Sequence, residues 1–139
     1  MSHTINDVMT HDPVSLPPGA TLDEAARCMR DHAIGDVLVA EDDQLRGMVT
    51  DRDIVVRALA EGRDPSRTTV AEVCTSDVTA LAPSDDIDEA IRLMSDRAVR
   101  RVPVVEHGRL VGIVAMGDLA IERDPDSALA DVSAAAPNR

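Results

Sequence analysis

The sequence predicts an α/β fold of the α+β type, in which one short unit occurs twice along the chain. The first observation is a gap-free alignment of residues 8–57 with residues 73–122, in which Leu22 falls on Ile87, an offset of 65 residues. The second is that helical and strand patterns follow the same order, α-β-α-β-β-α, in both halves. The third is composition, because 44% of the 139 residues are apolar and 29% are charged, as in soluble globular proteins.

Identical residues recur at this offset throughout the alignment. They are Asp12/Asp77, Pro18/Pro83, Asp23/Asp88, Glu24/Glu89, Ala25/Ala90, Met29/Met94, Leu45/Leu110, Gly47/Gly112 and Asp53/Asp118. A gap-free internal match of this length indicates a structural repeat. We expect two halves that fold alike, related by a pseudo-two-fold axis. The repeats are expected at residues 1–60 and 69–123, with a linker at 61–68 and an Ala-rich tail at 124–139, either a loosely attached helix or disordered.

Each half opens with a short helix and a short strand. The segments 4–7 and 69–72 begin with Thr and carry an acidic residue three positions later, which is the pattern of a helix N-cap. The strands are expected at residues 14–16 and 78–81.

A longer helix with one buried face follows in each half. Thr21 and Glu24 have the spacing of a capping box, and Asp86 with Glu89 resembles one. Behind these residues, apolar side chains recur at positions i, i+3, i+4 and i+7, which predicts burial of one helix face. The apolar positions are Leu22, Ala25, Ala26 and Met29 in the first half and Ile87, Ala90, Ile91 and Met94 in the second.

Two apolar runs separated by turn residues complete each half. The expected strands are residues 37–40 and 45–49 in the first half and 102–105 and 110–114 in the second, with hairpin turns at 41–44 and 106–109. A last helix is expected to begin near Asp51 in one half and near Met116 in the other.

Composition narrows the classes of function. The formal net charge of −12 disfavours nucleic acid and anionic membranes as partners, because binding to both depends on Lys and Arg. The chain has no apolar run as long as a membrane span and no apolar signal-peptide core, so we expect a cytoplasmic protein. Phe, Trp and Tyr are absent, so aliphatic side chains and backbone have to hold any flat ligand. No nucleophile–base pair, acid–base dyad or metal cluster has a suitable spacing, and an enzyme is not expected.

The segment from Gly47 to Asp53 carries the most informative chemistry. A glycine and two apolar residues end a strand, Thr50 then opens a helix, and Asp53 follows three positions later. The N-terminus of a helix suits a phosphate, to which Thr50 can donate its hydroxyl, while Asp53 can accept from ribose hydroxyls. The same Thr-x-x-Asp spacing is also a common helix cap.

The repeat, the run from Arg100 to Val105 and the Gly-x-x-Thr-x-x-Asp ending together resemble the CBS domain, named for cystathionine β-synthase. The resemblance covers residues 4–122 and implies a tandem CBS-domain pair, in which two β-α-β-β-α repeats pack sheet to sheet and form two clefts. It implies a non-enzymatic regulatory module that needs no cofactor, binds an adenosine-containing ligand such as AMP, ADP or ATP, and acts on a protein partner in trans.

Carried over to this chain, the resemblance implies one competent cleft and one degraded cleft. The first takes Thr50, Arg52 and Asp53 together with Thr79, Arg100, Arg101, Val102 and Pro103. The second takes Ala115 and Asp118 together with Val14, Ser15, Gly35, Asp36 and Val37. In the second cleft Ala115 replaces the Thr or Ser, Leu38 replaces the Pro, and Gly35 and Asp36 replace two arginines. Because a carboxylate repels a phosphate, we expect one nucleotide per chain.

Other interpretations remain open at this stage. Arg100 and Arg101 could form ion pairs at a subunit interface, where Arg is enriched. A homodimer is expected in any case, because one CBS pair leaves apolar helix faces uncovered and two-fold contacts are common. Its interface is expected on the helices that begin near Thr21, Asp51, Asp86 and Met116. The main rival function is a stress-related structural homodimer that has lost ligand binding.

A metal-binding or redox role is the remaining alternative. It would use the cysteines and histidines, which are Cys28, Cys74, His3, His11, His32 and His107. Cys28 aligns with Leu93 and Cys74 with Met9, which indicates packed thiols. The histidines have no mutual metal-ligand spacing, so no metal is expected.

Overall fold

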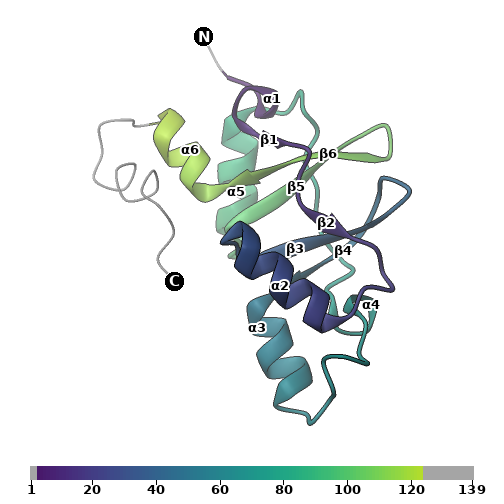
Figure 1. Ribbon diagram of the computed structural model, residues 1–139. Coiled ribbons are helices and arrows are strands. Elements are labelled where there is room, and N and C mark those ends of the chain that lie inside the picture. Colours follow the sequence, from purple (N-terminus) through teal and green to yellow (C-terminus); the bar gives the residue numbers. More distant parts are fainter. Residues whose placement is uncertain (1–2, 124–139) are drawn as a thin grey trace. The chain divides into compact units, whose positions relative to one another are not determined.

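The structure is a computed structural model that describes residues 3–123, and the tail at 124–139 lies outside the described residues. The described chain divides into two compact units. Unit 1 combines residues 3–13 with residues 79–123, and unit 2 is the continuous stretch from residue 14 to residue 78. Each unit has its own sheet (Figure 1). Each also has its own apolar core.

Unit 2 contains a three-stranded sheet in the order β2-β3-β4. β2 runs parallel to β3, and β3 forms an antiparallel hairpin with β4. A helix connects β2 to β3, and a helical stretch follows β4, first as an α-turn and then as a π-helix. The elements are β2 (Ser15–Leu16), α2 (Leu22–His32), β3 (Asp36–Glu41), β4 (Gln44–Thr50), α3 (Asp51–Asp53), η1 (Ile54–Leu59) and α4 (Val70–Val73).

Unit 1 contains a three-stranded antiparallel sheet in the order β1-β6-β5. Its elements are α1 (Ile5–Val8), β1 (Thr10–His11), α5 (Ile87–Arg97), β5 (Arg101–Glu106), β6 (Arg109–Ala115) and α6 (Met116–Arg123). The two-residue turns of both hairpins have positive φ values, at Asp42 and Asp43 in one and at His107 and Gly108 in the other, which matches the twist of the flanking strands.

The equivalence of the two repeats is confirmed residue by residue. The bounds of α1 and α4, α2 and α5, β3 and β5, and β4 and β6 all differ by the predicted offset. Strand pairing is matched as well, because Asp36 pairs with Thr50 as Arg101 pairs with Ala115. Even the irregularity after Val39 recurs after Val104.

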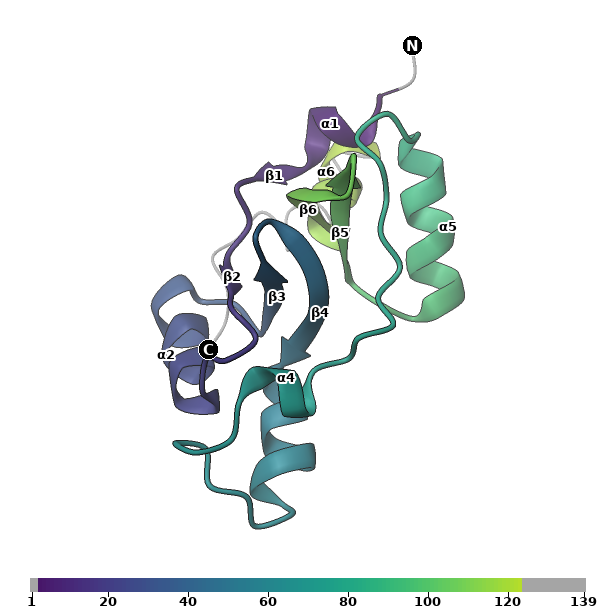
Figure 2. The same cartoon turned by 90° about the vertical axis from the view of Figure 1, so that its right-hand side faces the viewer.

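The opening segment of each repeat packs in the unit formed mainly by the other repeat. β1 pairs with β6 through Thr10 and Ile113, and the matched residues Thr75 and Met48 pair in unit 2. Figure 2 shows β1 alongside β6 in unit 1 and α4 beside the end of β4 in unit 2. The sequence repeats and the compact units are therefore different divisions of the same chain.

Two glycines allow the opening segments to pack closely against strands β4 and β6. A Cβ atom on Gly47 would lie 2.6 Å from the carbonyl oxygen of Thr75, and a Cβ on Gly112 would lie 2.9 Å from that of Thr10. No side chain fits at such distances, so the identical glycine pair of the alignment has a steric cause.

The predicted helix starts are mostly confirmed. In α2 the amide of Glu24 donates to Thr21 Oγ1 at 3.3 Å, and the amide of Thr21 donates to Glu24 Oε2 at 3.1 Å, which completes the capping box. α1 and α4 begin with capping boxes too. The capping pattern at the start of α5 is not realised, because the side chain of Asp86 makes no cap hydrogen bond.

Each core is aliphatic and lies between the sheet and its helices. Leu22, Ala25 and Met29 of α2 are buried in unit 2, as the periodicity predicts. Two predicted core positions are wrong, because Ala26 is exposed and Ile91 is 38% exposed. Both lie four residues after the first apolar position of their helix, so part of the apolar stripe remains on the surface.

Candidate functional site

The helix start at Thr50 is a closed capping box. The amide of Asp53 donates to Thr50 Oγ1 at 3.0 Å, and the amide of Thr50 donates to Asp53 Oδ2, also at 3.0 Å. The helix-cap interpretation of this motif is therefore confirmed. This cap still allows Thr50 to bind a ligand. Its hydroxyl oxygen accepts the bond from Asp53, and its hydroxyl proton remains available for donation to another acceptor.

Asp53 also retains acceptor capacity. Its carboxylate has about four lone-pair sites, of which one serves the amide of Thr50. Its Oδ1 lies 3.9 Å from Arg57 Nη1, and the side chain is 17% exposed. Sequence reasoning missed Arg57, although its spacing four residues after Asp53 on one helix was visible. Its matched residue is Glu122, so the two repeats differ in charge at this position.

Residues of both predicted clefts meet at the same place in unit 2. Asp36, the first residue of β3, pairs with Thr50, the last residue of β4. The amide of Asp51 donates to the carbonyl of Gly35 at 2.9 Å, and the Asp51 carboxylate lies 3.1 Å from the Cβ position of Gly35. The Asp51 carboxylate therefore lies beside Gly35, and Asp36 is a second acidic residue at the next position in the chain.

The matched place in unit 1 carries positive charge instead. Arg101 pairs with Ala115, and the amide of Met116 donates to the carbonyl of Arg100 at 2.8 Å. The amide of Ala115 donates to Asp118 Oδ2 at 3.1 Å, but Ala115 has no hydroxyl to return the bond. Unit 1 thus combines two arginines with half of a capping box, whereas unit 2 combines carboxylates with a complete one.

Proline at position 103 changes the backbone of the neighbouring segment. In unit 2 the amide of Leu38 donates to the carbonyl of Val14 at 3.4 Å. Pro103 stands at the matched position and has no N–H, so the carbonyl of Thr79 cannot receive the equivalent bond. The predicted strand at 78–81 is accordingly reduced to a single bridge between Leu81 and Val104. Thr79 is exposed, and Pro103 is fully buried.

The predicted site residues therefore fall into two groups by unit. Unit 2 holds Thr50, Arg52 and Asp53 together with Val14, Ser15, Gly35, Asp36 and Val37, and unit 1 holds Thr79, Arg100, Arg101, Val102 and Pro103 together with Ala115 and Asp118. Each predicted cleft draws on both groups.

The cysteines are free thiols that pack against the unit 2 core. Burial raises the pKa of Cys28, with a smaller contribution from Asp31, and burial is also the main cause that raises the pKa of Cys74. Cys28 Sγ lies 3.8 Å from His32 Nδ1. Within residues 3–123, no three His, Cys, Asp or Glu side chains are grouped to hold a metal ion.

The fold and these motifs define a CBS-domain pair. Residues 5–59 and 70–123 each match the CBS domain family, and the chain belongs to that family. It is 39% identical over 134 residues to the CBS domain-containing protein YhcV of Bacillus subtilis, covering 94% of this chain and 95% of YhcV. It is 40% identical over 118 residues to hypoxic response protein 1 of Mycobacterium tuberculosis, covering 84% of this chain and 82% of that protein.

Solved structures agree with this assignment. The crystal structure of Hypoxic Response Protein I, which has two coordinated zinc ions, matches with a TM-score of 0.79 over 84% of this chain and 96% of that one, at 40% identity. The CBS domain pair of protein MJ0100, in complex with 5-methylthioadenosine and S-adenosyl-L-methionine, matches with a TM-score of 0.80 over 91% and 100%, at 25% identity. Among the described residues of this chain, no helix has the length and apolar character needed to cross a membrane.

Proposed function

We propose that this chain is a non-enzymatic regulatory module that binds one adenosine-containing ligand per chain, with AMP, ADP or ATP as the candidates. It acts on a protein partner in trans, in the cytoplasm, and assembles as a homodimer. Support at the level of the family comes from the MJ0100 domain pair, whose structure contains two adenosine compounds.

The observation that carries the proposal is the backbone at Pro103. The missing N–H leaves the carbonyl of Thr79 without the bond that Val14 accepts from Leu38 in the other repeat. Adenine presents an exocyclic amino group that donates hydrogen bonds. An exposed backbone acceptor beside a proline is a fitting partner for that group, and it needs no aromatic side chain.

The remaining parts of the nucleotide have partners of the right chemistry. Asp53 can accept from ribose hydroxyls, and Thr50 has a hydroxyl proton to donate to a phosphate. Arg52, Arg100 and Arg101 supply positive charge in a chain whose net charge is −12. The other set of residues has the acidic Asp36 where the first has Arg101, and it has no hydroxyl at Ala115, which supports one ligand per chain.

A thermal-shift panel of AMP, ADP, ATP, NAD and S-adenosylmethionine identifies the ligand. A ligand present at about 100 times its dissociation constant should add about 2.7 kcal/mol to the free energy of unfolding. Calorimetry should then give one site per chain. Two equal sites would contradict the proposal.

Two aspartates at matched positions provide the site test. Asp53→Ala should weaken binding by roughly ten- to a hundredfold, because a hydrogen bond to a charged group is worth about 1.5–3 kcal/mol. Asp118→Ala should change the affinity little, because the second predicted cleft, to which Asp118 belongs, lacks the Thr hydroxyl and the two arginines. Thr50→Ala should also weaken binding, but its folding has to be measured in parallel, since loss of a cap costs about 1 kcal/mol. A larger effect of Asp118→Ala would overturn the assignment.

A structural homodimer without a ligand is the second candidate. The observation in its favour is that η1 exposes Val55, Val56 and Leu59, at 56%, 44% and 51%. Folded protein that binds no adenosine compound would favour this function. Sedimentation should give a dimer at micromolar concentration in either case, and a monomer would contradict the assembly.

A further inference from the structure

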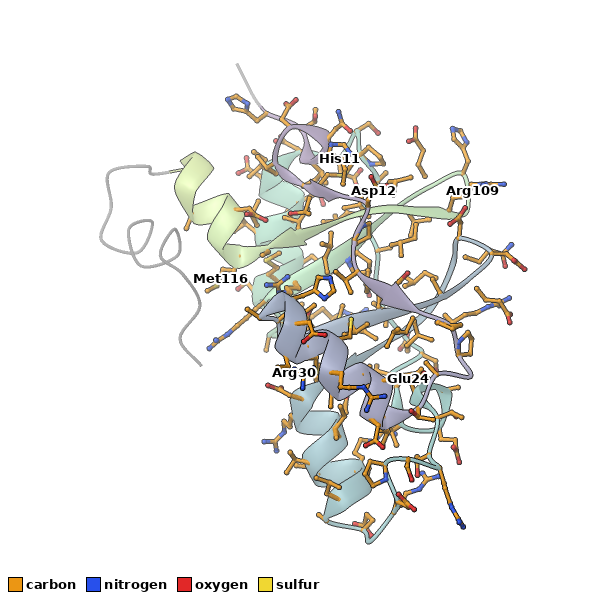
Figure 3. The ribbon with its side chains drawn as sticks, in the orientation of Figure 1. His11, Asp12, Glu24, Arg30, Arg109 and Met116 are labelled. Atoms are coloured by element: carbon orange, nitrogen blue, oxygen red, sulfur yellow. The ribbon has the colours of Figure 1, made fainter. Side chains whose placement is uncertain are left out.

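Unit 1 has an open pocket at the turn end of the β5–β6 hairpin. Its volume is about 640 Å³, within the usual range for small-molecule pockets. The start of α1, the loop at residues 82–84 and the end of β5 line it. Figure 3 labels Arg109, the first residue of β6, just after this turn, and Met116, which begins α6 at the opposite end of β6. The lining includes no residue of the helices expected at the dimer interface and none of either predicted nucleotide cleft.

The pocket opens where one segment of the chain leaves the edge of β5. Leu81 pairs with this edge, because its amide donates to the carbonyl of Pro103 at 3.0 Å and its carbonyl accepts from the amide of Val105 at 2.8 Å. Two residues later the chain is held by α1 instead, since the carbonyl of Pro83 accepts from the amide of Asn6 at 2.9 Å. This divergence leaves space beside the last residues of β5.

The backbone of this region recurs in unit 2, but the side chains differ. In both units the second residue of the opening helix donates its amide to a proline carbonyl, from Asn6 at 2.9 Å and from Ala71 at 3.2 Å. The matched loop residues are Ser84 in unit 1 and Gly19 in unit 2. Unit 1 therefore places an exposed amide and an exposed hydroxyl where unit 2 has neither.

Glu106 is the charged residue of the pocket, and its surroundings differ in the same way. Its counterpart Glu41 forms an ion pair at 3.4 Å with Arg46 of its own hairpin. Val111 stands at the position of Arg46 in unit 1, so Glu106 lacks this partner. The Glu106 side chain is 52% exposed, and its Oε1 lies 3.9 Å from Nε2 of His107. Unit 1 thus retains the carboxylate of the hairpin without the arginine that accompanies it in unit 2.

We propose that this pocket binds a small alkylammonium compound, a short methylene chain that carries protonated amino groups. A lining with one carboxylate and with no Lys or Arg favours a cation and disfavours phosphates and carboxylates. The oxygens of Asn6 and Ser84 can accept hydrogen bonds from an ammonium group. Ala82, Pro83 and Val105 supply apolar surface for the methylene groups. The proposal is independent of any nucleotide site.

Three probes of similar length test the chemistry of the ligand. We expect 1,4-diaminobutane to shift the backbone amide signals of Asn6, Ser84 and His107 in NMR spectra, with saturation at a single site. Succinate carries carboxylates and 1,4-butanediol carries hydroxyls in place of the ammonium groups, and neither should give saturable shifts at these amides. Equal binding of 1,4-butanediol would show that the pocket does not select a cation, and it would overturn the proposal.

Matched variants separate this pocket from a general attraction of cations to an acidic chain. Glu106→Gln should weaken the binding of 1,4-diaminobutane about fivefold, because the ion pair is partly exposed to solvent. Glu41→Gln removes the same charge at the matched position of unit 2 and should leave the affinity unchanged. Asn6→Ala combined with Ser84→Gly installs the residues of unit 2 without changing the charge, and it should also weaken binding.

The same spectra show whether each variant is folded, since the signals of unit 2 should remain in place. Shifts that never saturate, or that are equal in the Glu106→Gln and Glu41→Gln proteins, would assign the effect to the net charge of the chain. An unaffected Asn6→Ala and Ser84→Gly double variant would show that the amide and the hydroxyl do not contribute. Each of these results would refute the proposed site.

Discussion

One proline distinguishes the candidate binding segments of the two repeats. Pro103→Leu gives the second repeat the residue of the first and supplies an N–H for the carbonyl of Thr79. Since a neutral hydrogen bond is worth about 0.5–1.5 kcal/mol, we expect the affinity for the adenosine ligand to fall by up to about tenfold. Calorimetry measures the change. Pro17→Leu, at an exposed loop proline, should leave affinity unchanged, and an unaffected Pro103→Leu variant would remove the backbone acceptor from the proposal.

A substitution at Gly47 tests whether the segment at Cys74 and Thr75 packs so closely on β4 that only glycine fits. Gly47→Ala places a methyl group 2.6 Å from the carbonyl oxygen of Thr75 and 2.9 Å from Cys74 Sγ. Overpacking of this kind costs about 1–3 kcal/mol, so the midpoint of urea unfolding should fall. Gly19→Ala is the matched control, because nothing lies within 4 Å of its Cβ position. Equal stability of both variants, followed by circular dichroism, would contradict the steric explanation.

The sequence identifies Gly47, Gly112, Thr50 and Pro103 as notable residues, but it does not show why these residue types are needed at these positions. The identity of Gly47 and Gly112 is evident from the alignment, but the atoms that demand glycine belong to Thr75 and Thr10, which lie far away in the chain. The Thr-x-x-Asp spacing predicts a cap or a ligand site, and hydrogen-bond geometry was needed to establish the cap. The effect of Pro103 on Thr79 likewise depends on a strand pairing that local patterns do not encode.

At the scale of elements, the start of α4 predicts a dependence on pH. Hydrogen bonds from the amide and the hydroxyl of Thr69, and then from Arg63, lower the pKa of Glu72. A group whose pKa is lowered in the folded state contributes stability above its unfolded pKa, near 4.3, and that contribution disappears as the pH falls through the folded value. The stability advantage over Glu72→Gln should therefore be present at pH 7 and shrink below about pH 4.3.

Urea unfolding between pH 7 and pH 3 measures this difference. Glu61→Gln, at an exposed position outside any capping box, is the control and should show a much smaller change across the same range. A difference between wild type and Glu72→Gln that stays constant with pH would contradict the role of the carboxylate.

Periodicity predicts elements well where burial follows a regular pattern. The hairpin strands are one residue longer at each end than their apolar runs, because the flanking polar residues still pair. The π-helix η1 was not predicted, since its sequence is compatible with an ordinary α-helix. Periodicity also identifies an apolar helix face, but it does not show whether other residues cover that face. For this reason Ile91 was predicted to lie in the core, although it lies on the surface of unit 1.

For the whole molecule, the alignment predicts two like halves but leaves open which half each opening helix joins. Ile5 of α1 and Val70 of α4 are both apolar and occupy matched positions, so either arrangement satisfies the local pattern. The structure resolves the choice by burying Ile5 in the core of unit 1 and Val70 in the core of unit 2. Long-range packing, which a local sequence pattern does not contain, decides the division.

The compact units therefore predict which fragment folds. Residues 14–78 contain every member of the unit 2 core, including Val70 and Val73. We expect this fragment to unfold cooperatively on heating, although with low stability because small domains bury a smaller share of their surface. Residues 1–60, the first sequence repeat, lack Val70 and Val73 and carry Ile5 without its partners, so this fragment should show no cooperative transition by circular dichroism. The opposite result, cooperative unfolding of residues 1–60 and none of residues 14–78, would contradict this prediction. It would show that the sequence repeat is the folding unit and that the opening helices pack in the other unit only after each repeat has folded.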